Sequence, residues 1–233
     1  MGKALKAELE KKDYEVKAFS RSVEQKKDQI PFDFFKDQIT GDNDLATMVF
    51  TIPLFKDFKA AEKSFKFFLD QVPKAGHFIY ISSTSVFKND QGVCDENTEP
   101  APLTKRALEQ RRLELLVEQN VQNYTIVRSA GQIGPDRFPK IDRSKVKWGA
   151  LDRVNLIDQK DLVTAIFKIL SMKSLPKYLH AVSPYHPFKF EYYFGDEVCD
   201  KNLESNSKII KSNFFTEQDF ANLKLEHPNR LKF

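Results

Sequence analysis

An α/β fold, with a parallel sheet and helices on both of its faces, is predicted by two features of this 233-residue sequence. Strand-like and helix-like segments alternate along the chain, which is typical of parallel strands joined by helices. Several strand-like segments are continuous apolar runs, as expected for strands that are buried on both faces. We predict a main domain over residues 1–183 and a small C-terminal lobe, not independent of it, over residues 184–233.

The first half of the chain supplies strands and helices in turn. Amphipathic spacing predicts a helix over residues 2–12, which a strand over residues 14–19 follows. The apolar run LATMVFTI predicts a buried strand over residues 45–52, and phenylalanines then recur at helical spacing over residues 58–69. A further buried strand, HFIYISSTSVF, covers residues 77–87.

The second half of the chain continues the same alternation. A helix is predicted over residues 104–119, and the segment YTIVRSAG predicts a strand over residues 124–131. Asp161 is placed to cap an apolar helix over residues 162–170. The last predicted strand covers residues 177–182.

Ligands of open parallel sheets bind beyond the carboxyl ends of the strands. This rule directs attention to the ends of the predicted strands and to the residues just beyond them. These residues are Ser20, Arg21, Ser22, Ile52, Pro53, the run from Ser82 to Ser85, and the run from Arg128 to Gly131.

Composition argues against several classes of protein. The 37 basic and 33 acidic residues are dispersed and give a net charge of only +4, so charge does not predict nucleic-acid binding. No apolar run is long enough to span a membrane, and the N-terminus has no signal pattern. The two cysteines lie far apart in the sequence, and the four histidines show no metal-ligand spacing with them. We therefore expect a cytoplasmic protein with no metal, nucleic-acid or membrane partner.

Four motifs occur in the order in which one known family carries them. They are YISSTSVF at residues 80–87, DENTEPAP at 95–102, IVRSAGQIGPDRFP at 126–139 and NLIDQKDL at 155–162. Together they resemble the NAD-dependent epimerase/dehydratase family, and within it an atypical branch of the extended short-chain dehydrogenases/reductases. The resemblance covers about residues 2–170. It implies a Rossmann-like, doubly wound sheet that binds NAD(P), with a small C-terminal substrate lobe.

The resemblance also implies roles for individual residues. Gly2 matches the last glycine of the dinucleotide fingerprint, and Arg21 and Ser22 match positions that meet the adenosine ribose. An arginine there suits the 2′-phosphate of NADP, so we expect NADP with NAD as the open alternative, unless Arg21 is an ordinary surface arginine. The other residues implied are Ser83 and Thr84 as catalytic hydroxyls, Ile52, Pro53, Arg128 and Gly131 at the cofactor, and Pro135 and Arg137 at the substrate. Arg137 would meet an anionic substrate group.

The sequence departs from the family pattern where proton transfer is expected. The family uses a Tyr-x-x-x-Lys pair in which the lysine lowers the pKa of the tyrosine. Here these two positions fall at Arg106 and Gln110, neither of which can shuttle a proton at neutral pH. Asp158 stands where relatives often carry histidine. Ser83 is then either a catalytic hydroxyl or a residual strand-end hydroxyl.

A second departure lies at the start of the sequence, which begins at the helix of a dinucleotide motif. The first strand and the two glycines that meet the pyrophosphate have no counterpart before Gly2. Met1 is then an internal methionine of a longer chain, or another strand fills the central position, or the chain is a truncated relic. We favour the first explanation, and we expect the chain as given to bind a dinucleotide weakly or not at all.

Two functional classes remain open. One is an NAD(P)-dependent reductase-like or epimerase/dehydratase-like enzyme that acts on a small molecule such as a nucleotide sugar, with a homodimer as its possible assembly. The other is a non-catalytic dinucleotide sensor or scaffold of the same fold, which the loss of the Tyr/Lys pair favours. A nucleic-acid-binding module has little support beyond the basic residues of the helix over residues 104–119.

Overall fold

A sheet of four parallel strands forms the centre of the computed structural model, which describes residues 1–20, 29–37, 46–52, 57–72, 76–134, 141–145, 147–195 and 207–220. The strand order is β3, β4, β6, β9. Their bounds are Thr47–Phe50 for β3, His77–Ser83 for β4, Tyr124–Ser129 for β6 and Tyr178–Ala181 for β9. Every residue of β6 is buried, as expected for a central strand covered on both faces.

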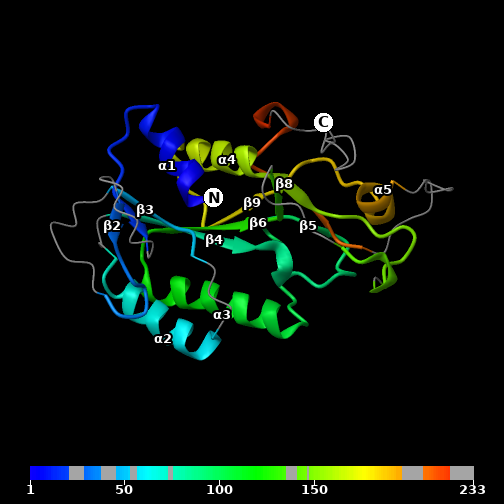
Figure 1. Ribbon diagram of the computed structural model, residues 1–233, viewed down its shortest axis with the longest axis horizontal. Helices are drawn as coiled ribbons and strands as arrows, with labels where there is room; N and C mark the ends of the chain where they lie inside the picture. The colour runs from blue at the N-terminus through cyan, green and yellow to red at the C-terminus, as the bar shows by residue number, and fades with distance from the viewer. Residues whose placement is uncertain are drawn as a thin grey trace.

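Helices cover both faces of this sheet (Figure 1). The helices α2 (Phe58–Leu69) and α3 (Lys105–Asn120) pack together on one face. The helices α1 (Gly2–Glu10) and α4 (Gln159–Ser171) pack together on the other. Side chains of β4 alternate between the two layers, so that Tyr80 joins the core under α2 and α3 while Ile79 joins the core that includes α4. The predicted α/β fold with a doubly wound parallel sheet is therefore confirmed.

Side-chain caps fix where the helices begin. Asp57 and Thr104 accept hydrogen bonds from backbone amides in the first turns of α2 and α3. For α4 the prediction of Asp161 as the cap was wrong. Asp158 is the N-cap and accepts from the backbone amide of Lys160 at 2.7 Å, while Asp161 is buried in the first turn.

Predicted strands end earlier in the structure, as two of them show. The predicted strand over residues 77–87 stops at Ser83, because the Ser83 hydroxyl accepts a hydrogen bond from the Ser85 amide and starts a 3₁₀ turn over Thr84–Val86. The predicted strand over residues 124–131 stops at Ser129. Gly131–Ile133 then form a separate strand, β7, which pairs in parallel with β8 (Leu156–Asp158).

Two smaller parallel pairs accompany the main sheet. One joins β1 (Ala18–Ser20) to β2 (Gln29–Pro31), and the other joins β5 (Val93–Cys94) to β10 (Ile209–Ile210). Within the described residues, the β1–β2 pair is not hydrogen-bonded to the four-stranded sheet. The remaining elements are the 3₁₀ turns Arg143–Lys145 and Glu217–Asp219 and the short helix α5 (Lys189–Phe194). None of the described helices is long and apolar enough to cross a membrane.

Candidate functional site

The predicted hydroxyl residues lie at the carboxyl edge of the sheet. Ser83 is the last residue of β4 and pairs in register with Ser129, the last residue of β6. The Oγ atom of Ser83 accepts a hydrogen bond from the amide of Ser85 at 3.2 Å. Thr84 follows in the 3₁₀ turn with only 6% of its surface exposed. The strand ends therefore place both hydroxyl residues where ligands of parallel sheets bind.

Gly2 begins α1 beside the end of β3. A Cβ atom on Gly2 would lie 3.3 Å from Oγ1 of Thr51, the residue before Ile52, so the helix start approaches this strand end closely. Ile52 is 36% exposed. No side chain caps the first turn of α1, so its amide groups can donate hydrogen bonds to an anionic partner. The structure thus places Gly2 close to the segment that carries Ile52.

Five other predicted residues lie outside the described part of the chain: Arg21, Ser22, Pro53, Pro135 and Arg137. The ribose contact of Arg21 and Ser22 stays a prediction. The cofactor contact of Pro53 and the substrate contacts of Pro135 and Arg137 stay predictions as well.

Arg128 lies in a buried ion pair beneath the sheet. Its side chain is 1% exposed, and its Nε and Nη2 atoms donate to the two carboxylate oxygens of Glu114 at 3.2 and 3.0 Å. The guanidinium also lies over the ring of Tyr178, with 4.4 Å between Cζ and the ring centroid. A direct contact between this guanidinium and a cofactor would therefore require the ion pair to open.

Gly131 has a packing reason to be glycine. A Cβ atom at this position would lie 3.0 Å from Cδ2 of Leu156 and 3.3 Å from the carbonyl oxygen of Asn155. The amide of Gly131 also donates to that carbonyl oxygen at 3.1 Å. The residue therefore lets β7 approach β8 closely. Its contact with a cofactor stays a prediction.

The two positions of the missing acid/base pair differ in their surroundings. Arg106 is exposed, whereas Gln110 is 3% exposed and faces the sheet. The side-chain amide of Gln110 donates to the hydroxyl of Tyr80 at 2.8 Å and to that of Ser82 at 3.0 Å. Burial, with the nearby Glu114 carboxylate, raises the pKa of Tyr80, so this phenol stays protonated. Gln110 therefore joins a buried hydrogen-bond network, and its own amide cannot exchange a proton near neutral pH.

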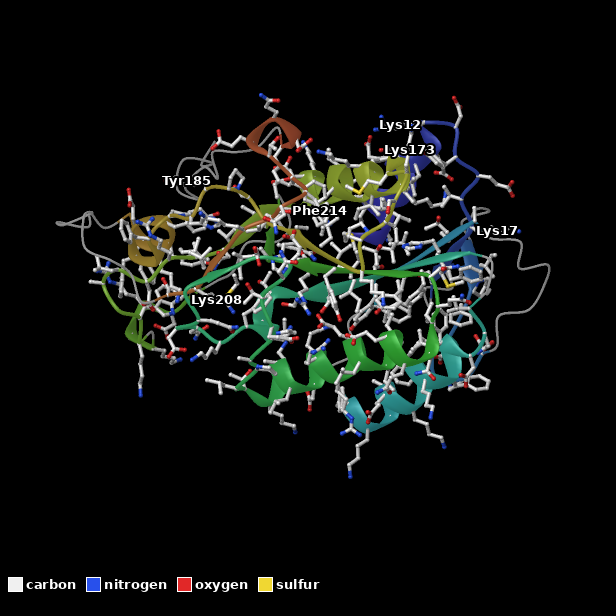
Figure 2. The ribbon with its side chains drawn as sticks, turned by 180° about the vertical axis from the view of Figure 1, so that it is seen from behind. Lys12, Lys17, Lys173, Tyr185, Lys208 and Phe214 are labelled. Atoms are coloured by element: carbon white, nitrogen blue, oxygen red, sulfur yellow. The ribbon has the colours of Figure 1, made fainter. Side chains whose placement is uncertain are left out.

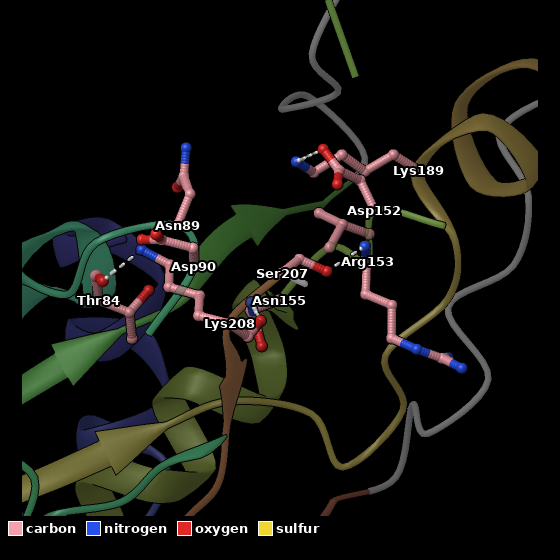
Figure 3. Close-up of a pocket in the computed structure, with 10 residues that line it drawn as sticks. Thr84, Asn89, Asp90, Asp152, Arg153, Asn155, Lys189, Ser207 and Lys208 are labelled. Carbon is pink, nitrogen blue, oxygen red and sulfur yellow. Dashed lines mark hydrogen bonds and ion pairs between the residues drawn. The ribbon is translucent and has the colours of Figure 1, made fainter. Parts of the chain in front are cut away.

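A pocket of about 340 Å³ opens beside Thr84 (Figure 3). Segments far apart in the sequence line it: Thr84 after β4, Asn89 and Asp90 before β5, residues 152–155 before β8, Lys189 in α5, and Ser207 and Lys208 before β10. The pocket thus joins the carboxyl end of β4 to the C-terminal part of the chain. Elsewhere in the described residues, no cluster of histidine, cysteine and carboxylate side chains could hold a metal ion.

Charged side chains on one side of the pocket have partners within the protein. Lys189 lies 3.2 Å from the carboxylate of Asp152. Arg153 turns away from the pocket, where its Nη1 atom donates to the carbonyl oxygen of His186 at 2.7 Å and its Cζ atom lies 4.1 Å from the centroid of the Phe188 ring (Figure 3). Burial and the Arg153 charge lower the pKa of His186 to about 4, so this imidazole is neutral at pH 7.

Glu96 and Asn155 also shape this region. Both lie in motifs described above, but the sequence alone predicted no role for either. The Glu96 carboxylate accepts from the His180 amide at 2.9 Å, from the Ser212 hydroxyl at 2.8 Å and from the Asn213 amide at 2.9 Å. The Asn155 side chain donates to the carbonyl oxygen of Lys208 at 3.0 Å and accepts from the amide of Ile210 at 2.8 Å. Both side chains hold the segment around β10 in place. Their motifs marked them, but their partners lie more than fifty residues away in the sequence.

Comparisons with known proteins agree with this fold. No protein-family model matches the chain. Protein YeeZ of Escherichia coli K12 is 30% identical over 118 residues, a match that covers 49% of this chain and 43% of YeeZ, so less than half of that relative is matched.

Two solved structures resemble most of the chain. MoeE5 in complex with UDP-glucose and NAD has a TM-score of 0.64 and 16% identity, covering 91% of this chain and 82% of its own. UDP-N-acetylglucosamine 4-epimerase from Bacillus cereus has a TM-score of 0.62 and 13% identity, covering 93% and 86%. Identities this low show the fold alone. The chain therefore has the Rossmann-like fold found in these two proteins, with its candidate site at the carboxyl edge of the sheet.

Proposed function

We propose that this chain is a dinucleotide-binding protein of the extended short-chain dehydrogenase/reductase type, which takes a small molecule in the pocket beside Thr84. One observation carries the proposal: Thr84, which directly follows β4 and is one of the two hydroxyl residues that the resemblance implies are catalytic, lines that pocket. The chemistry would be that of a reductase or an epimerase/dehydratase. A nucleotide sugar is the candidate substrate, because MoeE5 was solved with UDP-glucose and an epimerase of UDP-N-acetylglucosamine has the same fold.

The residues present fit a nicotinamide dinucleotide in part. Gly2 allows the close approach of α1 to the end of β3, and the uncapped amides of α1 suit a pyrophosphate. We propose that NADP is preferred over NAD, because an arginine at position 21 suits the 2′-phosphate of NADP.

The chemistry would have to proceed without the usual proton donor. Gln110 is buried in its contacts with Tyr80 and Ser82, and Arg106 keeps its proton at neutral pH. The hydroxyls of Ser83 and Thr84 remain as groups that could orient a substrate.

A non-catalytic dinucleotide sensor is the second candidate, and one observation favours it. Gln110 occupies the position of the family's lysine and makes hydrogen bonds only to buried groups among the described residues. A protein that keeps the fold and the pocket but binds without turnover would need no acid/base pair.

Cofactor titration tests the proposal. NADPH and NADH are titrated separately while the fluorescence of Trp148, the single tryptophan, and the melting temperature are followed. Trp148 reports on the pocket because the ammonium of Lys189, which lines it, lies 5.6 Å from the indole centroid. We expect both signals to respond more strongly to NADPH. No response to either dinucleotide would overturn the proposal.

Two variants make this test specific. Arg21→Ala should weaken NADPH binding about 10-fold or more and leave NADH binding unchanged, because only NADPH carries the 2′-phosphate. Lys63→Met, an exposed position on α2, is the control and should change neither affinity. Assays of the bound form with UDP-sugars then separate the two candidates, since turnover supports the enzyme and binding without turnover supports the sensor.

A further inference from the structure

Lys208 forms part of the pocket wall and is held there from both sides. Its backbone amide donates to the carbonyl oxygen of Asn89, and its own carbonyl oxygen accepts from the side chain of Asn155. The next residue, Ile209, begins β10, which pairs with β5. Lys208 is half-buried, whereas Lys12 and Lys17, which are labelled with it in Figure 2, are exposed. The backbone of Lys208 is therefore fixed at the pocket wall.

The ammonium group of Lys208 uses two of its three protons on backbone oxygens. It donates to the carbonyl oxygen of Thr84 at 2.9 Å and to that of Phe87 at 2.7 Å. An ammonium has three donors, so one N–H bond has no partner among the described residues. Lys208 and Thr84 lie on the same side of the pocket (Figure 3).

None of the described carboxylates that line the pocket pairs with this ammonium. Asp152 pairs with Lys189 at 3.2 Å, and Asp90 pairs with Lys88 at 3.7 Å. Burial, together with the charge of Lys189, lowers the pKa of Lys208 to about 8, so the group is mostly charged at pH 7. A partly buried cation without a counter-ion is unfavourable unless a ligand supplies the negative charge.

We propose that Lys208 binds an oxyanion, a phosphate or carboxylate group of the small molecule that occupies this pocket. The assignment of the molecule as a substrate or sensed ligand rests on the proposed function, whereas the oxyanion site itself rests on the pocket and its charges. The oxyanion accepts the remaining N–H bond of Lys208 and replaces the missing counter-charge. Lys189 lines the same pocket, but its charge is already paired with Asp152, so Lys208 is the cation left to bind the oxyanion. The substrate class is therefore an anionic small molecule.

Binding of two simple probes tests this site. Inorganic pyrophosphate and malonate are titrated by calorimetry at pH 7.5 against sodium chloride of equal ionic strength, which distinguishes a phosphate from a carboxylate preference. Lys208→Met should weaken the better probe by about 10- to 100-fold, because a charge-assisted hydrogen bond is lost. Lys63→Met is the matched control and should leave the affinity unchanged. Equal affinities in wild type and Lys208→Met would overturn the proposal.

A measurement on the wild-type chain covers the case in which Lys208→Met does not fold. Reductive methylation modifies unprotonated amines, and mass spectrometry follows Lys208 and Lys63 in the same sample. Saturating oxyanion should slow methylation of Lys208 about 10-fold, because it holds the ammonium protonated and covered, and should leave Lys63 unaffected. Equal rates at Lys208 with and without the oxyanion contradict the site. Absence of methylation in both conditions also contradicts it, since the pocket would then not admit small molecules.

The two proposals can fail separately. Protection of Lys208 by an oxyanion, with no response to NADPH or NADH, would leave the oxyanion site standing and overturn the proposed function. Dinucleotide binding without protection of Lys208 would overturn the oxyanion site and leave the proposed function standing.

Discussion

Glu114 is the residue on which the polar part of the core depends. Its side chain is fully buried, and its two carboxylate oxygens accept hydrogen bonds from Ser82, Arg111 and Arg128. Gln110, one turn earlier on α3, donates to the Ser82 hydroxyl, which in turn donates to Glu114. A buried carboxylate is tolerated only when such partners satisfy it. Arg128 therefore has a structural role in the described core, whatever ligand the sheet edge binds.

Removal of the Arg128 guanidinium should destabilise the fold. Arg128→Met should lower the free energy of unfolding by about 3 kcal/mol, the low end of the range for a broken buried pair, because Arg111 still contacts Glu114 at 3.0 Å. Urea denaturation measures the change. The control is Arg112→Met, which breaks a surface ion pair with Glu62 and should cost less than about 1 kcal/mol. Equal losses in the two variants would show that burial does not govern this pair.

At the scale of elements, long periodic segments were predictable and short ones were not. The spacing of apolar residues located α2 and α3 to within a residue. The buried face of α2 is apolar, whereas that of α3 also carries Gln110 and Glu114, which the spacing did not indicate. The strands β5, β8 and β10 have two or three residues each, too few to show a period. Their pairing partners are set by contacts between distant segments.

The site follows the same division. The strand-end residues Ser83 and Thr84 were found from the sequence because the carboxyl edge of a parallel sheet is a general ligand position. Lys208 could not be predicted from the sequence, because its ammonium contacts Thr84 and Phe87, which lie more than a hundred residues earlier. Asp161 was mistaken for a cap because Asp158, three residues before it, has the same side chain and also precedes the apolar run.

The cap of α4 gives a test at this scale. Asp158→Ala should lower the free energy of unfolding by about 1 kcal/mol, because the amide of Lys160 loses its side-chain acceptor. Asp158→Asn keeps an oxygen at that position and should lose only part of this amount. Thermal or urea denaturation of the two variants checks the order. Equal losses would indicate that the charge of Asp158, and not its capping bond, stabilises α4.

Over the whole molecule, the two outer strands of the four-stranded sheet are protected differently. β3 has a strand partner on one side, β4, within the described residues. β9 is the other outer strand and, in the described part of the chain, has β6 as its one strand partner, but Glu96 accepts from its His180 amide. The central strands β4 and β6 have partners on both sides. Backbone amides with a strand on both sides open only with the sheet itself.

Hydrogen exchange should reveal this difference. Amides of β4 and β6 should exchange slowest, and those of β3 faster, when followed by mass spectrometry or NMR. The amide of His180 on β9 should be slower than amides of β3, and Glu96→Gln should speed it by weakening the acceptor. Protection of β3 equal to that of β4 would indicate that another segment covers the edge of β3 in solution.

Because Glu96 bonds to residues synthesised much later, its hydrogen bonds can form only late in translation. Glu96 and Ser212 are separated by 116 residues, and β5, which ends at Cys94, gains β10 as its partner strand only from the same late part of the chain. At translation rates of about 5–20 residues per second, this interval lasts about 6–23 s. Through that time the ribosome-bound chain holds an unpaired strand and a carboxylate without its later partners. The segment of the pocket wall that carries Lys208 is therefore synthesised after all four strands of the main sheet.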